Sequence, residues 1–258
     1  MSRRLKAALG FLIFQLGLHR IMLRRKAIVV LFHRVDDRYA SDAISCSVEK
    51  FERFCTFFCR YFTVVPLGTL VEKVQRGEDV SGHLVVTFDD GYLDNHQIAA
   101  PLLKRRQVPA CFFIATDFVE SDRVPWWDRE AGIQSEWMSW DQVRDLAAQG
   151  FELGAHTCNH VDLGVVNGEE ARREITDSGT RLAKEVGVDV GLFSYPYGRR
   201  NQITDANRQL VRDAGYDCCM SAYGGNVTPD SNPYDLRRIP ISQWYVSAYQ
   251  FGFEALRA

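Results

Sequence analysis

Short apolar runs rich in β-branched and aromatic residues alternate along this chain with stretches of helical periodicity. The runs span 27–32, 62–65, 84–88, 110–115, 151–155, 192–195, 216–220 and 238–241. The helical stretches between them span 47–60, 67–76, 96–106, 140–149, 169–186 and 202–214. Continuous apolar strands separated by helices indicate a parallel sheet covered by helices. Seven or eight such units in about 230 residues predict an α/β fold that closes, or nearly closes, into a barrel.

Local signals mark the ends of several predicted helices. Ser139 precedes Trp140 and is a typical N-cap residue. Gly150, Gly187 and Gly215 each follow a helical stretch, where a left-handed C-cap glycine is expected. In a barrel of this kind the active site is expected at the carboxyl ends of the strands, so polar residues at those ends are candidates for function.

Charge and cysteine content narrow the class of protein. The formal net charge of −2 gives no indication of a nucleic-acid-binding protein. Seven cysteines is an odd number, and most of them lie in apolar runs. This pattern favours reduced thiols that pack as small hydrophobes over a disulfide framework, and it predicts a cytoplasmic location.

Residues 1–26 differ from the rest and are treated as a separate segment, with a catalytic domain expected over 27–258. Basic residues flank an apolar run from Ala7 to Leu18, which is too short for a transmembrane helix. One interpretation is a basic interfacial helix that lies on an anionic membrane surface as a peripheral contact. The other is a helix that packs on the domain or frays.

Two adjacent carboxylates, Asp89 and Asp90, follow the apolar run 84–88 and precede Gly91. At the exit of a strand both side chains can reach one pocket with different roles. One can bind a metal ion while the other takes a proton from water. An ordinary Asp-Asp-Gly turn explains the same residues, and for this motif alone it is the better explanation.

Two histidines, His156 and His160, follow the apolar run 151–155. Four residues apart, they would share one face of a helical turn, which suits binding of one metal ion. Two histidines and one carboxylate leave open positions on the metal, as a hydrolytic site requires. The alternative, a chance pair of surface histidines, is less favoured because the pair begins at a strand end.

Two further motifs stand at strand ends. The sequence Ser-Tyr-Pro-Tyr-Gly at 194–198 predicts a shaped loop whose backbone N–H groups can point at an oxyanion, or a plain turn. His33 directly follows the run 27–32 and is a candidate general acid or a satisfied rim residue. Four polar clusters at four strand exits are more specific together than any one motif.

The set of Thr87–Gly91, His156-x3-His160 and Tyr195–Gly198 resembles the polysaccharide deacetylases, the NodB-homology domain of carbohydrate esterase family 4. The resemblance covers about residues 27–241. It implies a distorted (β/α)7 barrel, here with an extra N-terminal basic helix, and a divalent metal, most often zinc. It also implies that Asp90, His156 and His160 are the metal ligands, that Asp89 is the general base and that the N–H of Tyr197 helps to hold the oxyanion.

The chain departs from the family pattern at two points. Many members carry an arginine where Ser194 stands, braced against the catalytic aspartate, and either Arg237 or Arg238 is a candidate replacement. Many members also carry a catalytic histidine near the C-terminus, but no histidine follows His160. Some relatives that act on exported poly-N-acetylglucosamine carry it on the first strand in a Tyr/Phe-His-x-Val motif, which residues 32–35 match. His33 is therefore assigned as the acid.

The resemblance implies a metal-dependent hydrolase that removes an N-acyl group, with acetyl expected, from an amino sugar or glycan. The basic N-terminal segment and the reduced thiols favour a bacterial surface glycan or its precursor as the substrate. Trp126 and Trp127 are candidates for stacking on the sugar, with Trp137, Trp140 and Trp244 as further candidates, although packing at the barrel rim explains each equally well. Two alternatives stay open: a non-catalytic carbohydrate-binding member of the same fold, and a deformylase of a lipid-linked amino sugar.

Overall fold

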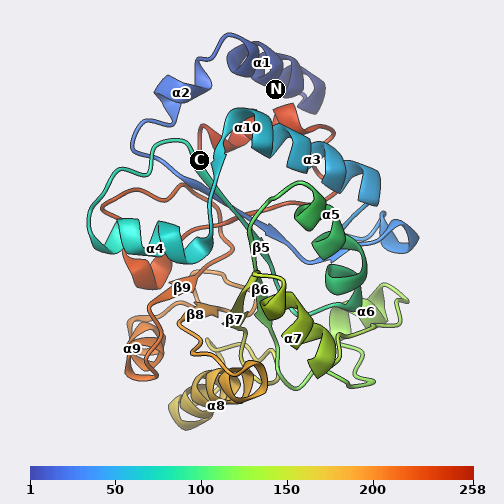
Figure 1. Cartoon of the computed structure of the whole chain (residues 1–258), viewed down its shortest axis with the longest axis vertical. Coiled ribbons are helices and arrows are strands. Elements are labelled where there is room, and N and C mark those ends of the chain that lie inside the picture. Colours follow the sequence, from blue (N-terminus) through green and yellow to red (C-terminus); the bar gives the residue numbers. More distant parts are fainter.

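A curled parallel sheet lies at the centre of the computed structural model, which describes residues 1–258 (Figure 1). Seven strands pair in the order β10–β1–β5–β6–β7–β8–β9. Their bounds are β1 (Ile28–Phe32), β5 (His83–Phe88), β6 (Ala110–Ile114), β7 (Glu152–Ala155), β8 (Leu192–Ser194), β9 (Cys218–Met220) and β10 (Ile239–Pro240). The two ends of the path, β9 and β10, are linked only by a bridge between Met220 and Leu236 just before β10, so the barrel is incompletely closed. The predicted distorted (β/α)7 barrel is confirmed.

Helices surround the sheet in the expected alternation (Figure 1). They are α3 (Val48–Tyr61), α4 (Leu67–Gln75), α5 (Ala100–Arg105), α6 (Trp126–Glu130), α7 (Trp140–Ala148), α8 (Gly168–Val186), α9 (Asp205–Asp213) and α10 (Ala248–Ala255). The remaining short elements are β2 (Arg34–Val35), β3 (Ser45–Cys46), β4 (Thr63–Val64), η1 (Asp37–Tyr39), η2 (Asn95–Ala99) and η3 (Pro233–Asp235). β2 pairs with β3, and β4 pairs with the first residues of β5.

The local signals in the sequence are borne out where they could be checked. Ser139 caps α7 in a capping box with Gln142. Gly150, Gly187 and Gly215 have φ values of +88°, +74° and +87°, as C-cap glycines require. The helix predicted to start near residue 96 is different, because it begins with the π-helical turn η2 and becomes α-helical only at Ala100.

The alternation of side chains along the strands divides the core into two faces. Phe32, Phe88 and Phe112 point outward, where their rings stack and pack against α3 and α5. Val29 and Val85 belong to a separate cluster inside the barrel. Because successive residues of a strand face opposite sides, Thr87 and Asp89 continue the inner face of β5. The barrel interior therefore becomes polar toward the carboxyl end of the sheet.

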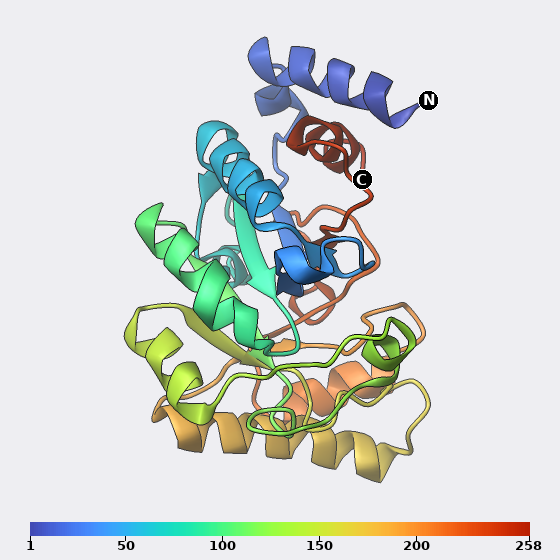
Figure 2. The same cartoon turned by 90° about the vertical axis from the view of Figure 1, so that its right-hand side faces the viewer.

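The N-terminal segment forms two helices, α1 (Arg3–Gln15) and α2 (His19–Met22). Figures 1 and 2 show α1 lying across α10 as the outermost layer at one end of the molecule. Phe14 is buried against Phe57 and Tyr61. The inner face of α1 thus packs on the domain, as one of the two interpretations predicts. None of the helices is both long and apolar enough to cross a membrane.

Candidate metal centre and active site

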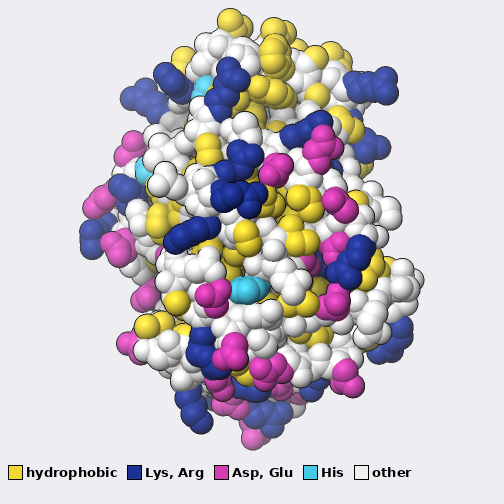
Figure 3. All heavy atoms as spheres, turned by 45° about the vertical axis from the view of Figure 1, so that its right-hand side comes forward, with side chains coloured by type: hydrophobic (Ala, Val, Ile, Leu, Met, Phe, Trp, Pro, Cys, Tyr) yellow, Lys and Arg dark blue, Asp and Glu magenta, His cyan; other side chains and the backbone are white.

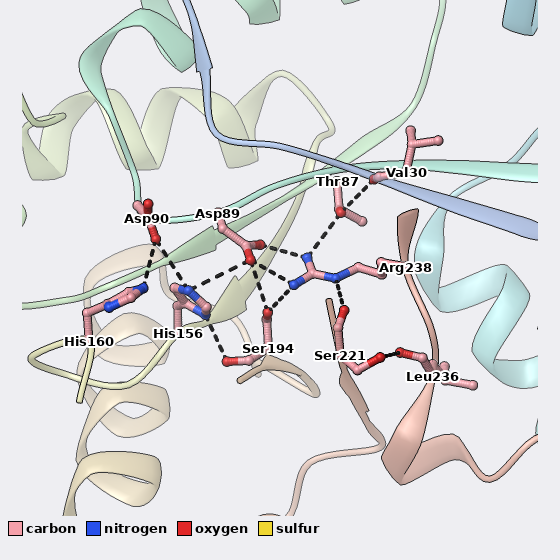
Figure 4. A network of polar contacts seen from close by, with 10 residues as sticks. All are labelled: Val30, Thr87, Asp89, Asp90, His156, His160, Ser194, Ser221, Leu236 and Arg238. Carbon is pink, nitrogen blue, oxygen red and sulfur yellow. Dashed lines mark hydrogen bonds and ion pairs between the residues drawn. The ribbon is translucent and has the colours of Figure 1, made fainter. Parts of the chain in front are cut away.

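Side chains from the exits of β5, β7 and β8 meet at one end of the half-barrel (Figure 4). Asp89 and Asp90 follow β5, His156 follows β7 and Ser194 ends β8. All four are buried, as is His160. Because the carboxyl ends of parallel strands lie at one edge, the aspartate pair and the histidine pair meet there, although they are 66 or more residues apart in sequence.

Asp90, His156 and His160 form a three-sided group that fits a divalent cation. The Oδ1 atom of Asp90 lies 3.3 Å from the Nε2 atoms of both histidines, and the three ligand atoms lie within 4.8 Å of one another. Atoms bound about 2.0–2.1 Å from one tetrahedral ion stand about 3.3–3.4 Å apart. Asp90 Oδ1 is buried and accepts no hydrogen bond, as expected of an atom placed to bind a cation.

The His156 ring is held in the orientation that a metal ligand needs. Its Nδ1 atom lies 2.8 Å from the backbone carbonyl oxygen of Ser194. Since a carbonyl can only accept, Nδ1 donates to it, and Nε2 is the ring nitrogen that faces Asp90 and is available to a metal ion. Such an outer hydrogen bond fixes both the tautomer and the ring orientation of a metal-binding histidine.

The expectation of a helical turn at residues 156–160 is wrong. Thr157 and His160 have φ values of +62° and +54°, so the segment is a loop in which the left-handed conformation occurs twice. Glu174 of α8 holds this loop, because its carboxylate accepts hydrogen bonds from the backbone N–H groups of Cys158 and Asn159 at 2.9 and 2.8 Å. Strained backbone of this kind persists only where the surroundings fix it, and it is common at functional sites.

Arg238 is the arginine that pairs with Asp89. Its Nη1 and Nη2 atoms lie 2.7 Å from the two carboxylate oxygens of Asp89 (Figure 4). Nη2 also donates to the Ser194 Oγ at 2.7 Å, Nη1 to Thr87 Oγ1 at 3.2 Å, and Nε to the Ser221 carbonyl at 2.7 Å. All five guanidinium hydrogens therefore have an acceptor. Arg237, the other candidate, is exposed on the opposite side of the chain.

Electrostatics keep Asp89 ionised in spite of its burial. Burial acts to raise the pKa of the Asp89 carboxyl, but the charges of Arg238 and His156 outweigh it and hold that pKa below its ordinary value. The Oδ2 atom of Asp89 lies 3.7 Å from His156 Nε2, so this oxygen faces the three-residue group. An ionised carboxylate in this position can accept a proton from a molecule held between the two.

His33 lies beside the same group of charges. Burial lowers the pKa of the imidazole, and the charges of Asp90 and Asp89 offset this only in part. The loop that carries it is tied to η2, because Asn95 donates to the His33 carbonyl at 2.7 Å and Asp94 accepts from the Val35 N–H at 2.7 Å. Its position at the strand exit agrees with the sequence, whereas its role as the acid stays a prediction.

Asp94→Asn is expected to raise the free energy of unfolding at pH 7 by roughly 2–3 kcal/mol. Burial raises the pKa of the Asp94 carboxyl to about 6, from an ordinary value of 3.8. The folded state therefore binds this proton more tightly, and the wild-type protein loses stability as the pH rises from about 4 to 6. The amide keeps an acceptor for the Val35 N–H without ionising. Urea unfolding from about pH 4 to 7 measures the free energy of unfolding of both proteins. If this free energy changed with pH in parallel for the wild type and Asp94→Asn, the prediction would be contradicted.

Aromatic side chains border the metal-binding group and line a cleft of about 370 Å³. Trp127 lies 4.7 Å from the His160 ring, Tyr197 lies 4.9 Å from it, and Trp126 donates to the Tyr197 hydroxyl at 3.2 Å. The N–H of Tyr197 donates to no acceptor within the protein. Trp137 and Trp140 are buried in packing roles, and Trp244 lies beside Arg3 at the N-terminus, so these three do not line the cleft.

The position of Trp127 is fixed by a hydrogen-bonded network around a buried ion pair that the sequence does not reveal. Arg34 and Asp128 are 94 residues apart, both are buried, and their charged atoms lie 2.5 Å apart. Asp128 also accepts from the Tyr92 hydroxyl at 3.1 Å, which in turn accepts from Trp127 Nε1 at 2.9 Å. The only sequence signal is an acidic residue directly after the Trp-Trp pair, which is too common to identify such a network.

Asp90→Asn is expected to weaken zinc binding by more than the roughly 10–100-fold that loss of an outer-sphere partner costs, because it removes the only carboxylate of the group. Competition with a chromophoric chelator measures the affinity. Asp117→Asn is a suitable control, since Asp117 pairs with Arg181 at 2.6 Å and belongs to no such group. Equal zinc affinities of the two variants would remove Asp90 from the ligand set.

Comparisons with solved structures support the fold at low sequence identity. IcaB from Ammonifex degensii superposes with a TM-score of 0.74 at 20% identity, over 90% of this chain and 97% of that one. The Streptococcus pyogenes deacetylase PplD in complex with acetate gives a TM-score of 0.73 at 18% identity, over 88% and 96% of the two chains.

Sequence comparison agrees with the structural likeness. Putative polysaccharide deacetylase YxkH of Bacillus subtilis strain 168 is 24% identical over 182 residues, which is 70% of this chain and 60% of that protein. The family profile described as polysaccharide deacetylase matches residues 76–219. This range is more than half of the chain and contains Asp89, Asp90, His156, His160 and Tyr197. The chain therefore belongs to the polysaccharide deacetylase family.

Proposed function

We propose that this protein is a divalent-metal-dependent hydrolase that removes an N-acyl group, in the first instance acetyl, from an amino sugar of a bacterial surface glycan or its precursor. The observation that carries the proposal is the meeting of a cation-binding group with an ionised, arginine-held carboxylate at one strand-exit edge. Zinc suits the one-carboxylate, two-histidine donor set. A bound ion of this kind polarises a carbonyl and lowers the pKa of water toward neutrality.

Asp89 is the general base in this proposal. Its Oδ2 atom faces His156 and is held by Arg238 and Ser194, so the carboxylate is fixed in one orientation. There it takes a proton from the water that attacks the acyl carbon. Arg238 keeps the carboxylate ionised between turnovers and does not itself contact the substrate.

Tyr197 and His33 complete the proposed reaction. The Tyr197 N–H is free to donate to the oxyanion that forms on the acyl group, an interaction worth roughly 3–4 kcal/mol when well placed. His33 delivers a proton to the departing nitrogen, because an amide nitrogen leaves poorly unless it is protonated. The cleft bordered by Trp126 and Trp127 would hold the sugar ring against their faces.

The seven free cysteines support a cytoplasmic location for the domain, where thiols stay reduced. A glycan precursor that is still attached to its carrier would be available there. The substrate is therefore proposed to be an intermediate of glycan assembly as well as, or in place of, the finished polymer.

Acyl release from a panel of N-acetylated and N-formylated amino-sugar donors tests the proposal. We expect acetate release that is lost with chelator, restored by zinc, and absent in Asp89→Asn. Faster release of formate would favour the deformylase alternative. Binding of N-acetylglucosamine oligomers without any acyl release would favour a non-catalytic carbohydrate-binding protein instead.

A further inference from the structure

Exposed hydrophobic side chains are concentrated on α1 and α2. Eight of the thirteen large hydrophobic residues that are exposed in the whole molecule lie within residues 1–22. They are Met1, Leu5, Phe11, Leu12, Leu16, Leu18, Ile21 and Met22. Leu16 and Ile21 are 71% and 73% exposed. Figure 3 shows the resulting apolar surface at the end of the molecule that α1 forms. Such clustering is unusual, whereas isolated exposed hydrophobic residues are not.

This surface is fixed in place, because the inner face of α1 is already packed. A Cβ atom on Gly10 would lie 2.0 Å from the Tyr249 carbonyl oxygen, so only glycine permits the observed contact with α10. Phe14 is buried, and Lys6 pairs with Glu254 at 2.8 Å. The exposed residues therefore cannot be covered by a simple rotation of the helix onto the domain.

The charged side chains within residues 1–26 are all of one sign. No Asp or Glu occurs before Asp36. Seven basic residues lie in the same segment, namely Arg3, Arg4, Lys6, Arg20, Arg24, Arg25 and Lys26. Only Lys6 and Arg25 pair with a carboxylate. The guanidinium of Arg3 lies 4.6 Å from the centre of the half-exposed Trp244 ring, which adds a tryptophan to the edge of the surface.

We propose that α1 and α2 dock this protein on an anionic lipid bilayer, with α1 lying in the plane of the interface. A helix of 13 residues is about 20 Å long and lies on a membrane without crossing it. An anionic bilayer offers acyl chains that can cover the exposed apolar side chains. Its negatively charged headgroups can pair with the basic residues around them. A second copy of the chain fits less well, because a two-fold contact would place this cationic segment against itself.

Flotation of the full chain with lipid vesicles tests the proposal. We expect binding to phosphatidylcholine vesicles that contain about 30% phosphatidylglycerol, weak binding without it, and release as salt rises from about 0.1 to 0.5 M. The triple variant L12Q/L16Q/I21Q should bind at least tenfold more weakly. Arg20→Gln and Arg24→Gln should each lose roughly fivefold on anionic vesicles alone.

A matched control is the double variant V165Q/V188Q, which removes two exposed valines elsewhere on the surface and should bind like the wild type. Wild-type protein that does not float, or a triple variant that floats equally well, would overturn the proposal. So would a dimer in solution that the triple variant converts to a monomer without any binding to vesicles. None of these measurements requires an active enzyme, so the proposed function can fail without affecting them.

Discussion

Arg238→Met is expected to lower the free energy of unfolding by roughly 3–5 kcal/mol, the usual cost of removing one partner of a buried ion pair. Arg238 is fully buried, and both of its terminal nitrogens lie 2.7 Å from Asp89. The substitution leaves the Asp89 carboxylate in the barrel interior without a counter-charge. The carboxylate then tends to take up a proton, so we also expect deacylation to fall by at least about 100-fold.

Two controls separate the ion pair from a general effect of mutation. Arg237→Met changes the neighbouring residue, which is exposed and does not contact Asp89, and it should cost less than about 1 kcal/mol. The double variant D89N/R238M removes both charges and should recover part of the lost stability without recovering activity. Urea unfolding and acyl-release assays measure the two effects. Equal stabilities of Arg238→Met and Arg237→Met would contradict the prediction.

His33→Ala is expected to lower the rate of acyl release by roughly 100- to 10,000-fold while zinc binding persists. The imidazole is placed near Asp89 and Asp90 but belongs to no metal-binding group. The protonated ring is the active acid, and burial lowers its pKa. Wild-type kcat/KM should therefore fall as pH rises through that value, and this alkaline fall should be missing in the variant.

His96→Ala provides the matched control for loss of a histidine. His96 pairs with Asp145 at 2.8 Å on the outer helices, so its removal should leave turnover unchanged. Zinc content and thermal unfolding of both variants show whether the site is intact. A wild-type rate in His33→Ala would mean that the proton comes from another group and that the first-strand assignment is wrong.

The fold and the position of the site could be predicted because each depends on local patterns. Continuous apolar runs define the strands, and parallel strands place their exits at one edge. Asp89, Asp90 and His156 directly follow strands, so they could be grouped on this basis. The choice between Arg237 and Arg238 depends instead on which of the two side chains points into the barrel just before β10. Ile239 points outward, so Arg238 must point inward, but that alternation is known only once the strand is placed in the sheet.

Other features depend on contacts between segments that are distant in sequence. The histidine loop is not helical, because Glu174 of α8 binds its backbone and holds Thr157 and His160 in a conformation that their sequence disfavours. The Arg34–Asp128 pair joins β2 and α6 through residues that are 94 positions apart. No periodicity or spacing in one sequence predicts either contact.

The complete set of five acceptors around Arg238 also limits which residues position 194 can accept. Ser194, which stands where the family resemblance implies an arginine, is itself one of those acceptors. Restoring arginine there while Arg238 remains would crowd two cations around a single carboxylate, and losing Arg238 first would leave none. Either single substitution is therefore expected to destabilise the site, so moving the positive charge from position 238 to position 194 would require two compensating substitutions. Positions 194 and 238 are consequently expected to tolerate substitution together and not singly.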